Sequence, residues 1–251
     1  MKMVLLTALG VGGATLFGTV LGFIFKKISH KFSDIVLSVA AGVMLCAAVT
    51  GLIMPSLEYE GPAPLLVTIA GVLSGAVFLN LLDKLVPHLH RLAGTEQEDH
   101  AQASARLNKV LLFVMAIAIH NLPEGIAAGV GFGSGDNAQA FTIAAGIALQ
   151  NIPEGMVIIG PMLAAGMSPK KTFLCAAATG VVEVVGTLLG YFAVSISAAV
   201  LPFALAFAGG TMLYVISDEM IPETHHSETR GVTYAMLIGF CIMLAMDYSL
   251  G

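Results

Sequence analysis

The amino-acid sequence predicts an all-α, polytopic membrane protein with eight transmembrane helices. Of its 251 residues, 57% are hydrophobic and 11% are charged, whereas a soluble domain contains about 25% charged residues. Apolar runs of about 20 residues recur along the chain, and each can cross a hydrocarbon core of about 30 Å as a helix. We therefore expect a multi-pass protein of the cell (inner or plasma) membrane whose surface faces the lipid bilayer.

Eight apolar runs meet this length requirement. The first is too long for the apolar region of a signal peptide, so we interpret it as a retained helix. The polar stretch 88–109 follows the third run and is expected to be a cytoplasmic loop within a single transmembrane domain, 1–251. The predicted helices cover about 3–25, 33–57, 63–86, 110–131, 138–166, 171–198, 201–222 and 231–250.

Lysine and arginine predict the orientation of these helices. Ten of the 11 basic residues fall in connections on one side of the membrane, and only Lys2 falls on the other. Because basic residues accumulate on the cytoplasmic side, both termini are expected outside the cytoplasm. The ten are Lys26, Lys27, Lys31, Lys84, Arg91, Arg106, Lys109, Lys170, Lys171 and Arg230.

The fourth and fifth predicted helices contain an internal repeat. It reads His-Asn-Leu-Pro-Glu-Gly from His120 and Gln-Asn-Ile-Pro-Glu-Gly from Gln150. Residues three and four apart share one helix face, so each repeat presents its first two polar side chains together with its glutamate. Mid-helix prolines free a backbone carbonyl and kink a helix, and paired interruptions of this kind are typical of a transporter's substrate site. The prolines are Pro123 and Pro153.

Three glutamates are predicted near the middle of the bilayer, namely Glu124 and Glu154 of the repeats and Glu183 of the sixth helix. Thr179 and Thr187 flank Glu183 at one turn. A charged acid at the centre of a membrane costs about 2.5–3.5 kcal/mol or more, so it normally has a partner. No lysine or arginine occurs in 110–169 or 172–229. A bound cation is the economical partner for these acids.

The candidate ligands indicate which cation this is. They combine imidazole, carboxylate and amide groups with the thioether of Met44, and this set suits zinc and neighbouring ions such as Cd²⁺, Fe²⁺, Mn²⁺ and Co²⁺. The number of groups allows two metals bridged by carboxylates, and one metal remains an alternative. The predicted metal residues are Met44, His120, Asn121, Glu124, Gln150, Asn151, Glu154 and Glu183.

The two repeats, the lone glutamate on the sixth helix and the run Ser-Asp-Glu-Met-Ile-Pro-Glu-Thr-His-His from Ser217 resemble the ZIP (Zrt-, Irt-like protein) family of metal transporters. The likeness is closest to its GufA-type prokaryotic branch and covers essentially the whole chain. It implies zinc uptake into the cytoplasm, with helices one, four, five and six moving as a unit against the others, in an elevator-type alternating-access cycle.

The resemblance also implies roles for individual residues. One metal would lie among Met44, His120, Glu124, Gln150 and Glu154, with Met54 competing for the place of Met44. The other would lie among Asn121, Glu124, Asn151, Glu154 and Glu183. An inner exit relay would contain Asp218, Glu219, Glu223 and His225, and outer attractants would be Glu58, Glu60 and Asp247. Many relatives have a second histidine where this chain has Gln150.

Other readings of the same residues remain open. Histidine and glutamate around zinc can activate water, so an intramembrane zinc-dependent hydrolase is one alternative, although no His-Glu-x-x-His motif occurs. An exporter, or a proton-coupled carrier of another solute with the glutamates as proton relays, is another. We expect no enzyme, no catalytic residue, no resident cofactor and no nucleic-acid partner. Divalent metal ions and the lipid bilayer are the expected partners, and a homodimer is left open.

Overall fold

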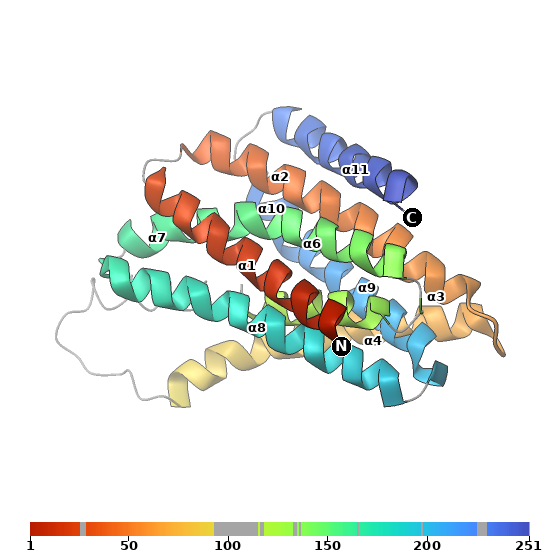
Figure 1. The fold of residues 1–251 in the computed structure, drawn as a ribbon. Coiled ribbons are helices and arrows are strands. Elements are labelled where there is room, and N and C mark those ends of the chain that lie inside the picture. Colours follow the sequence, from red (N-terminus) through yellow and green to blue (C-terminus); the bar gives the residue numbers. More distant parts are fainter. Residues whose placement is uncertain are drawn as a thin grey trace.

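The protein is described by a computed structural model that covers residues 1–25, 29–92, 115, 118–132, 135, 137–164, 166–196, 198–224 and 230–250. Every regular element in these ranges is a helix (Figure 1). The elements are α1 (Lys2–Ile24), α2 (His30–Cys46), η1 (Ala47–Ile53), α3 (Met54–Glu58), α4 (Pro64–Leu92), a helical segment at 118–131, α6 (Asn137–Val157), α7 (Ile159–Ala164), α8 (Pro169–Ile196), η3 (Ala198–Val200), α9 (Leu201–Val215), η4 (Ile216–Met220), α10 (Ile221–Thr224) and α11 (Arg230–Leu250).

Seven of the described helices, counted with their continuations, are long and apolar enough to cross a membrane. They coincide with seven of the eight predicted runs, which confirms an all-α, multi-pass membrane protein. The segment 118–131 occupies the place of the remaining run, but its described part is shorter than the other seven, so the count of eight stays a prediction. The helix α4 extends to Leu92, into the stretch expected to be a loop. The residues 93–114, which make up most of that loop, lie outside the described ranges.

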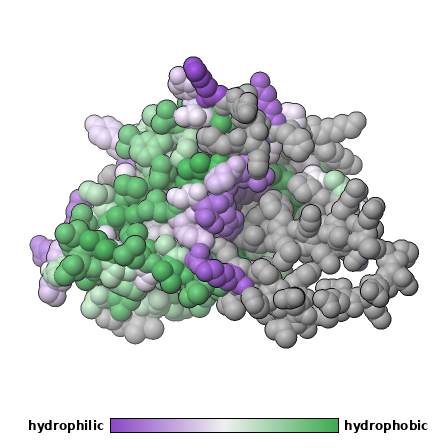
Figure 2. Space-filling view, turned by 180° about the vertical axis from the view of Figure 1, so that it is seen from behind, coloured by the Kyte–Doolittle hydropathy of each residue, from purple (hydrophilic) through white to green (hydrophobic). Residues whose placement is uncertain are grey.

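The outward faces of the helices carry large apolar side chains. Leu73 on α4 is 61% exposed, Leu174 on α8 is 66% exposed and Ile238 on α11 is 56% exposed. Figure 2 shows a broad hydrophobic area on one face of the molecule, with a narrower hydrophilic band beside it. Lipid tails would cover such apolar surface in a membrane protein, so the exposed leucines and isoleucines here belong to the lipid-facing surface.

The helical geometry widens at two places that sequence analysis did not predict. The segments η1 and η4 are π-helical, and each is followed within two residues by a proline, Pro55 or Pro222. Proline has no N–H and its ring crowds the carbonyl four residues earlier, so a wider turn relieves the clash. By contrast, helix continues through Pro123 and through Pro153. Kinks at these two prolines stay a prediction.

Glycines let the helices pack backbone against backbone in two groups. We call α1, the segment 118–131, α6 and α8 the repeat group, and α2, α4, α9 and α11 with their continuations the flanking group. In the repeat group, a Cβ at Gly18 would meet the Ile152 backbone, and one at Gly125 would meet the Glu183 backbone. In the flanking group, Gly75 similarly faces the Phe207 backbone. Small residues of this kind allow the close helix contact that is typical of membrane proteins.

Candidate metal centre

Side chains from the other three helices of the repeat group meet at Glu183 of α8. Its carboxylate is fully buried and accepts three side-chain hydrogen bonds, each from a different helix. Asn121 Nδ2, from the segment 118–131, and Thr15 Oγ1, from α1, donate to Oε1, the latter at 2.6 Å. Asn151 Nδ2, from α6, donates to Oε2 at 2.7 Å. The structure therefore brings both repeat asparagines to the same acid on α8.

Glu124 is the second buried acid, and one donor contacts it among the described residues. Gln150 Nε2 donates to its Oε1 at 2.8 Å, and this contact joins the first repeat to the second. Its other oxygen, Oε2, is buried and has no hydrogen-bond partner among the described residues. Glu124 thus keeps one carboxylate oxygen available to a further ligand.

The amide oxygens of the repeats are also buried without a donor. Asn121 Oδ1, Gln150 Oε1 and Asn151 Oδ1 have no hydrogen-bond partner in the described part of the chain. Leaving a buried polar atom unpaired costs about 1–3 kcal/mol. With Glu124 Oε2, the two repeats contain four such acceptors, so their burial requires an explanation. A cation bound by oxygen ligands supplies what a donor would otherwise supply.

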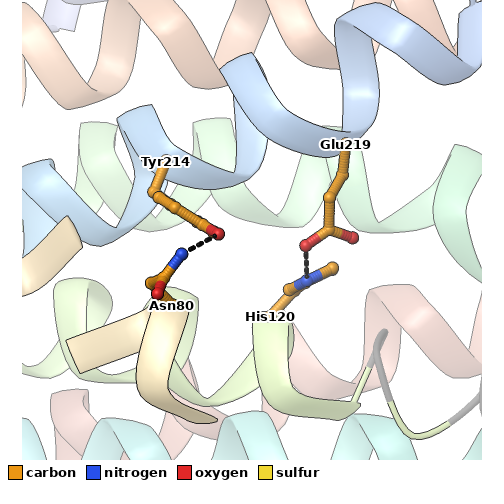
Figure 3. Close-up of polar contacts among 4 residues, drawn as sticks. All are labelled: Asn80, His120, Tyr214 and Glu219. Carbon is orange, nitrogen blue, oxygen red and sulfur yellow. Dashed lines mark hydrogen bonds and ion pairs between the residues drawn. The ribbon is translucent and has the colours of Figure 1, made fainter. Parts of the chain in front are cut away.

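His120 and Glu154 form the half-open side of the site, and Figure 3 shows His120 facing Glu219. His120 Nε2 lies 2.5 Å from Glu219 Oε1 of η4, an ion pair when the imidazole is protonated. The approach lacks the angle of a hydrogen bond, so this nitrogen also has no directed partner. Glu154 is half-buried, and electrostatic interactions link it to His120 and Glu219. Glu124 lies close enough to Glu154 and Glu183 for like-charge repulsion, so the three acids are neighbours.

These side chains are not preassembled as a simple metal cage. No group of three or more His, Cys, Asp or Glu residues has metal-binding geometry in the described ranges. The reason is visible in the hydrogen bonds, because amide N–H groups hold two of the three acids and the amide oxygens are the atoms left over. A metal held here would need oxygens from asparagine and glutamine as well as from carboxylates.

Comparison with known proteins identifies the family. The family model for the ZIP zinc transporters matches residues 87–247. The chain is 39% identical to the zinc transporter GufA of Myxococcus xanthus over 98% of both chains. It is 36% identical to the zinc transporter ZIPB of Bordetella bronchiseptica, over 95% of this chain and 78% of the relative, and 30% identical to the zinc transporter ZupT of Shigella dysenteriae serotype 1, over all of both. The chain belongs to the ZIP family.

Membership of the ZIP family confirms the broad function as metal transport, while the role of the residues above as its metal site stays a prediction. The family and these relatives are zinc transporters and not enzymes, which decides against the intramembrane hydrolase. Zinc as the transported ion is supported by the same relatives. The other ions that the ligand chemistry allows stay predictions.

Met44, a predicted ZIP ligand, and Met54, the competing choice for its place, differ strongly in exposure. Met44 on α2 is fully buried, in an apolar cluster that also contains Ala127 and Ile147, next to the repeats in sequence. Met54, the competing choice, is 42% exposed on α3. The fold thus keeps Met44 near the repeats and turns Met54 outward, while the role of Met44 as a ligand stays a prediction.

The predicted pathway residues of this ZIP protein lie at the two ends of the bundle. On η4 and α10, Glu219 reaches the site, whereas Asp218 and Glu223 are exposed and do not. The fourth member of the inner relay, His225, lies outside the described residues. At the opposite end (Figure 1), Glu58 and Glu60 are exposed near α3, and Asp247 is half-buried near the end of α11.

Sequence analysis missed two polar contributions to this region. Thr15 on α1 bonds Glu183, whereas Thr179 and Thr187, which the sequence placed beside it, donate to carbonyls of their own helix at 2.8 and 2.9 Å. Asn80 on α4 donates to the Tyr214 hydroxyl on α9 at 2.9 Å, beside the His120 and Glu219 pair (Figure 3). The only sequence signal was a polar residue inside an otherwise apolar helix.

Proposed function

We propose that this protein carries zinc into the cytoplasm through a two-metal site inside the membrane, by an alternating-access cycle of the elevator type. The observation that carries the proposal is a set of buried acceptor oxygens that have no donor among the described residues; they belong to Asn121, Glu124, Gln150 and Asn151. They belong to two repeats whose surrounding stretches contain no lysine or arginine. A divalent cation would compensate both the unpaired oxygens and the acidic charge.

The chemistry of the groups supports zinc and two positions for it. The first set of ligands would combine nitrogen and oxygen, which suits zinc. It would contain the His120 imidazole, the Glu124 and Glu154 carboxylates and the Gln150 amide oxygen. Near Glu183, the ligands would be carboxylates and the oxygens of Asn121 and Asn151. Glu124 and Glu154 would serve both metals, and Met44 would complete the first set.

The two packing groups support a rigid-body cycle. Contacts between backbones occur at glycines inside each group, as described above, whereas glycines at the boundary face the ends of flexible side chains. A Cβ at Gly51 on η1 would meet Ile143 Cγ1 of α6 at 2.8 Å, and one at Gly146 on α6 would meet Met243 Sδ of α11 at 2.6 Å. Flexible side-chain ends can slide past one another more readily than interlocked backbones, so the boundary is suited to relative movement of the groups.

Charge supports the inward direction. The distribution of ten basic residues favours a cytoplasmic location for the connections that include 26–31 and 170–171, and a location outside the cytoplasm for both termini. Glu219 contacts His120, and the exposed Asp218 and Glu223 are near it in the sequence. A metal leaving His120 would therefore meet a series of carboxylates, completed by His225, on its way to the cytoplasm.

Flux measurements on the reconstituted full-length protein test this proposal. Proteoliposomes enclosing a fluorescent zinc indicator receive an external zinc gradient, and the orientation of the protein is determined by impermeant labelling at an added N-terminal cysteine. We expect zinc entry that Glu154→Ala or His120→Ala lowers at least about tenfold, because loss of a group at a metal site costs about that much or more. Thr187→Val, whose hydroxyl bonds only its own helix, is the matched control and should transport normally.

The alternatives give different results in the same assay. Zinc movement only from the cytoplasmic side outward would identify an exporter. Proton movement without any bound or transported metal would favour a carrier of another solute. Unchanged zinc flux in both Glu154→Ala and His120→Ala would overturn the assignment of the site.

A further inference from the structure

The helix α1 contributes a side chain to the metal centre although it has no ionisable residue except Lys2 at its start. Thr15 Oγ1 donates a hydrogen bond of 2.6 Å to Glu183 Oε1, and the two residues are 1% and 0% exposed. The Val11 carbonyl, one turn earlier on α1, accepts a longer bond of 3.4 Å from Asn151 Nδ2. The helix α1 therefore contacts two predicted ligands, Glu183 and Asn151.

Close backbone packing places Thr15 at this position. A Cβ at Gly155 of α6 would meet the Thr15 carbonyl, and a Cβ at Gly180 of α8 would lie 2.7 Å from the Gly12 carbonyl and 3.5 Å from Thr15 Cβ. Because both glycines lack that atom, α1 settles against α6 and α8. The side chain of residue 15 is thereby held between the two helices, level with Glu183.

The hydrogen bond of Thr15 is unusual for a buried threonine of this protein. Thr19, Thr179 and Thr187 donate to carbonyls three or four residues earlier on their own helices, which is the ordinary behaviour of threonine in a helix. Thr15 instead donates across helices to an acid. The Thr15 carbonyl accepts a hydrogen bond from the Thr19 hydroxyl at 2.9 Å. Hydrogen bonds therefore hold both the side chain and the backbone of Thr15.

The hydroxyl of Thr15 holds the Glu183 carboxylate in one orientation. Asn121 and Asn151 also donate to Glu183, but each of them is itself a predicted metal ligand with a free oxygen. Thr15 is the donor that would keep its bond to Glu183 when those amides engage a cation. Ligating carboxylates are generally held by such outer hydrogen bonds, and removing one typically lowers metal affinity about 10- to 100-fold.

We propose that Thr15 is a positioning residue of the metal site, whose hydroxyl orients the Glu183 carboxylate toward the oxygens of Asn121 and Asn151. The proposal rests on the proposed function, because it takes Glu183 as a metal ligand. It adds α1 to the elements that determine metal affinity. A threonine hydroxyl is required at this position, and its methyl group is not.

The experiment compares variants of the full-length protein in nanodiscs. Thr15→Val keeps the shape of the side chain and removes the hydroxyl, Thr15→Ala removes both, and Thr15→Ser restores the hydroxyl alone. Thr179→Val is the matched control, since Thr179 is equally buried and lies one turn from Glu183. Zinc dissociation constants are measured by calorimetry, and the infrared carboxyl band of Glu183, identified by its absence in Glu183→Gln, is recorded in metal-free protein.

We expect Thr15→Val and Thr15→Ala to raise the zinc dissociation constant about tenfold or more, with Thr15→Ser and Thr179→Val within about twofold of the unchanged protein. The Glu183 band should shift in Thr15→Val and not in Thr15→Ser. Using two hydroxyl-free variants prevents a folding defect in one of them from deciding the result. Unchanged affinity in both, with affinity lost in Glu183→Gln, would overturn the role of Thr15 alone. Absence of zinc binding by the unchanged protein would overturn the proposed function as well.

Discussion

The two repeats have nearly the same sequence and unequal surroundings. Their asparagines behave alike, since both donate to Glu183. Their first residues pair across the repeats: Gln150 donates to Glu124, while His120 interacts electrostatically with Glu154. The Gln150 and Glu124 pair is fully enclosed, with both residues at most 1% exposed. The His120 and Glu154 pair is half-open and lies against Glu219 of the flanking group.

This comparison separates what the motif determines from what its neighbours determine. Helical spacing brings a polar pair and a glutamate to one face in each repeat, whatever surrounds them. The enclosed pair is covered by the repeat group, whereas the half-open pair faces η4, which leads to the exposed acids Asp218 and Glu223. In the proposed function, the enclosed half would hold a metal and the half-open half would release it.

The largest expected effect is from removing charge in the enclosed half. Glu124→Gln should lower zinc affinity about 100-fold or more, and Glu154→Gln about tenfold. Water can replace a lost ligand oxygen at the half-buried position of Glu154 but not at the 1% exposed position of Glu124. Calorimetric zinc titration of the purified variants measures the difference. Equal losses would show that enclosure does not distinguish the two halves.

Exchanging the first residues of the repeats should have a smaller effect and would sharpen the comparison. Gln150→His adds a second imidazole, so we expect zinc affinity and the preference for zinc over manganese to rise about tenfold, since imidazole favours zinc. His120→Gln should lower the same preference. Competition uptake with both metals measures it, and Thr187→Val is again the control. A loss of affinity in Gln150→His would mean that the hydrogen bond from Gln150 to Glu124 matters more than the amide oxygen.

The smallest expected effect concerns the contact between the half-open pair and the flanking group. Glu219→Gln removes a charge 2.5 Å from His120 Nε2, with the Glu219 side chain 31% exposed. A partly exposed pair contributes about 0.2–1 kcal/mol, so zinc uptake should slow by up to about fivefold. Zinc affinity should change little, because Glu219 is not among the predicted ligands. Steady-state uptake at saturating zinc measures the rate, and a larger change in affinity than in rate would contradict an exit role.

Sequence reasoning identified the helices and the polar motif because both depend on local pattern. Apolar length determines where a membrane helix can lie, and the boundaries of α1 and α8 agree with the predicted runs within a few residues. The repeat asparagines and Glu183 were expected in one site, and the structure connects them through hydrogen bonds. Their binding of metal stays a prediction, as do the roles of Met44 and of the exit relay.

The parts that sequence reasoning missed depend on contacts between helices distant in the chain. Thr15 precedes Glu183 by 168 residues, and nothing local to either residue indicates that they meet. Threonine usually bonds its own helix, so the flanking Thr179 and Thr187 were the natural expectation. The widened turns η1 and η4 were missed for a related reason, because the sequence drew attention to the prolines of the repeats rather than to Pro55 and Pro222.

The widened turn η4 also determines which way Glu219 faces. An α-helix advances about 100° per residue, so rewinding Ile216–Met220 as regular α-helix without removing a residue would rotate the side chains after this turn, relative to those before it, by about that angle. A carboxylate that now meets His120 would then turn toward a neighbouring helix or the lipid. The wide turn therefore determines whether the acids beyond Val215 face His120 or point away from it.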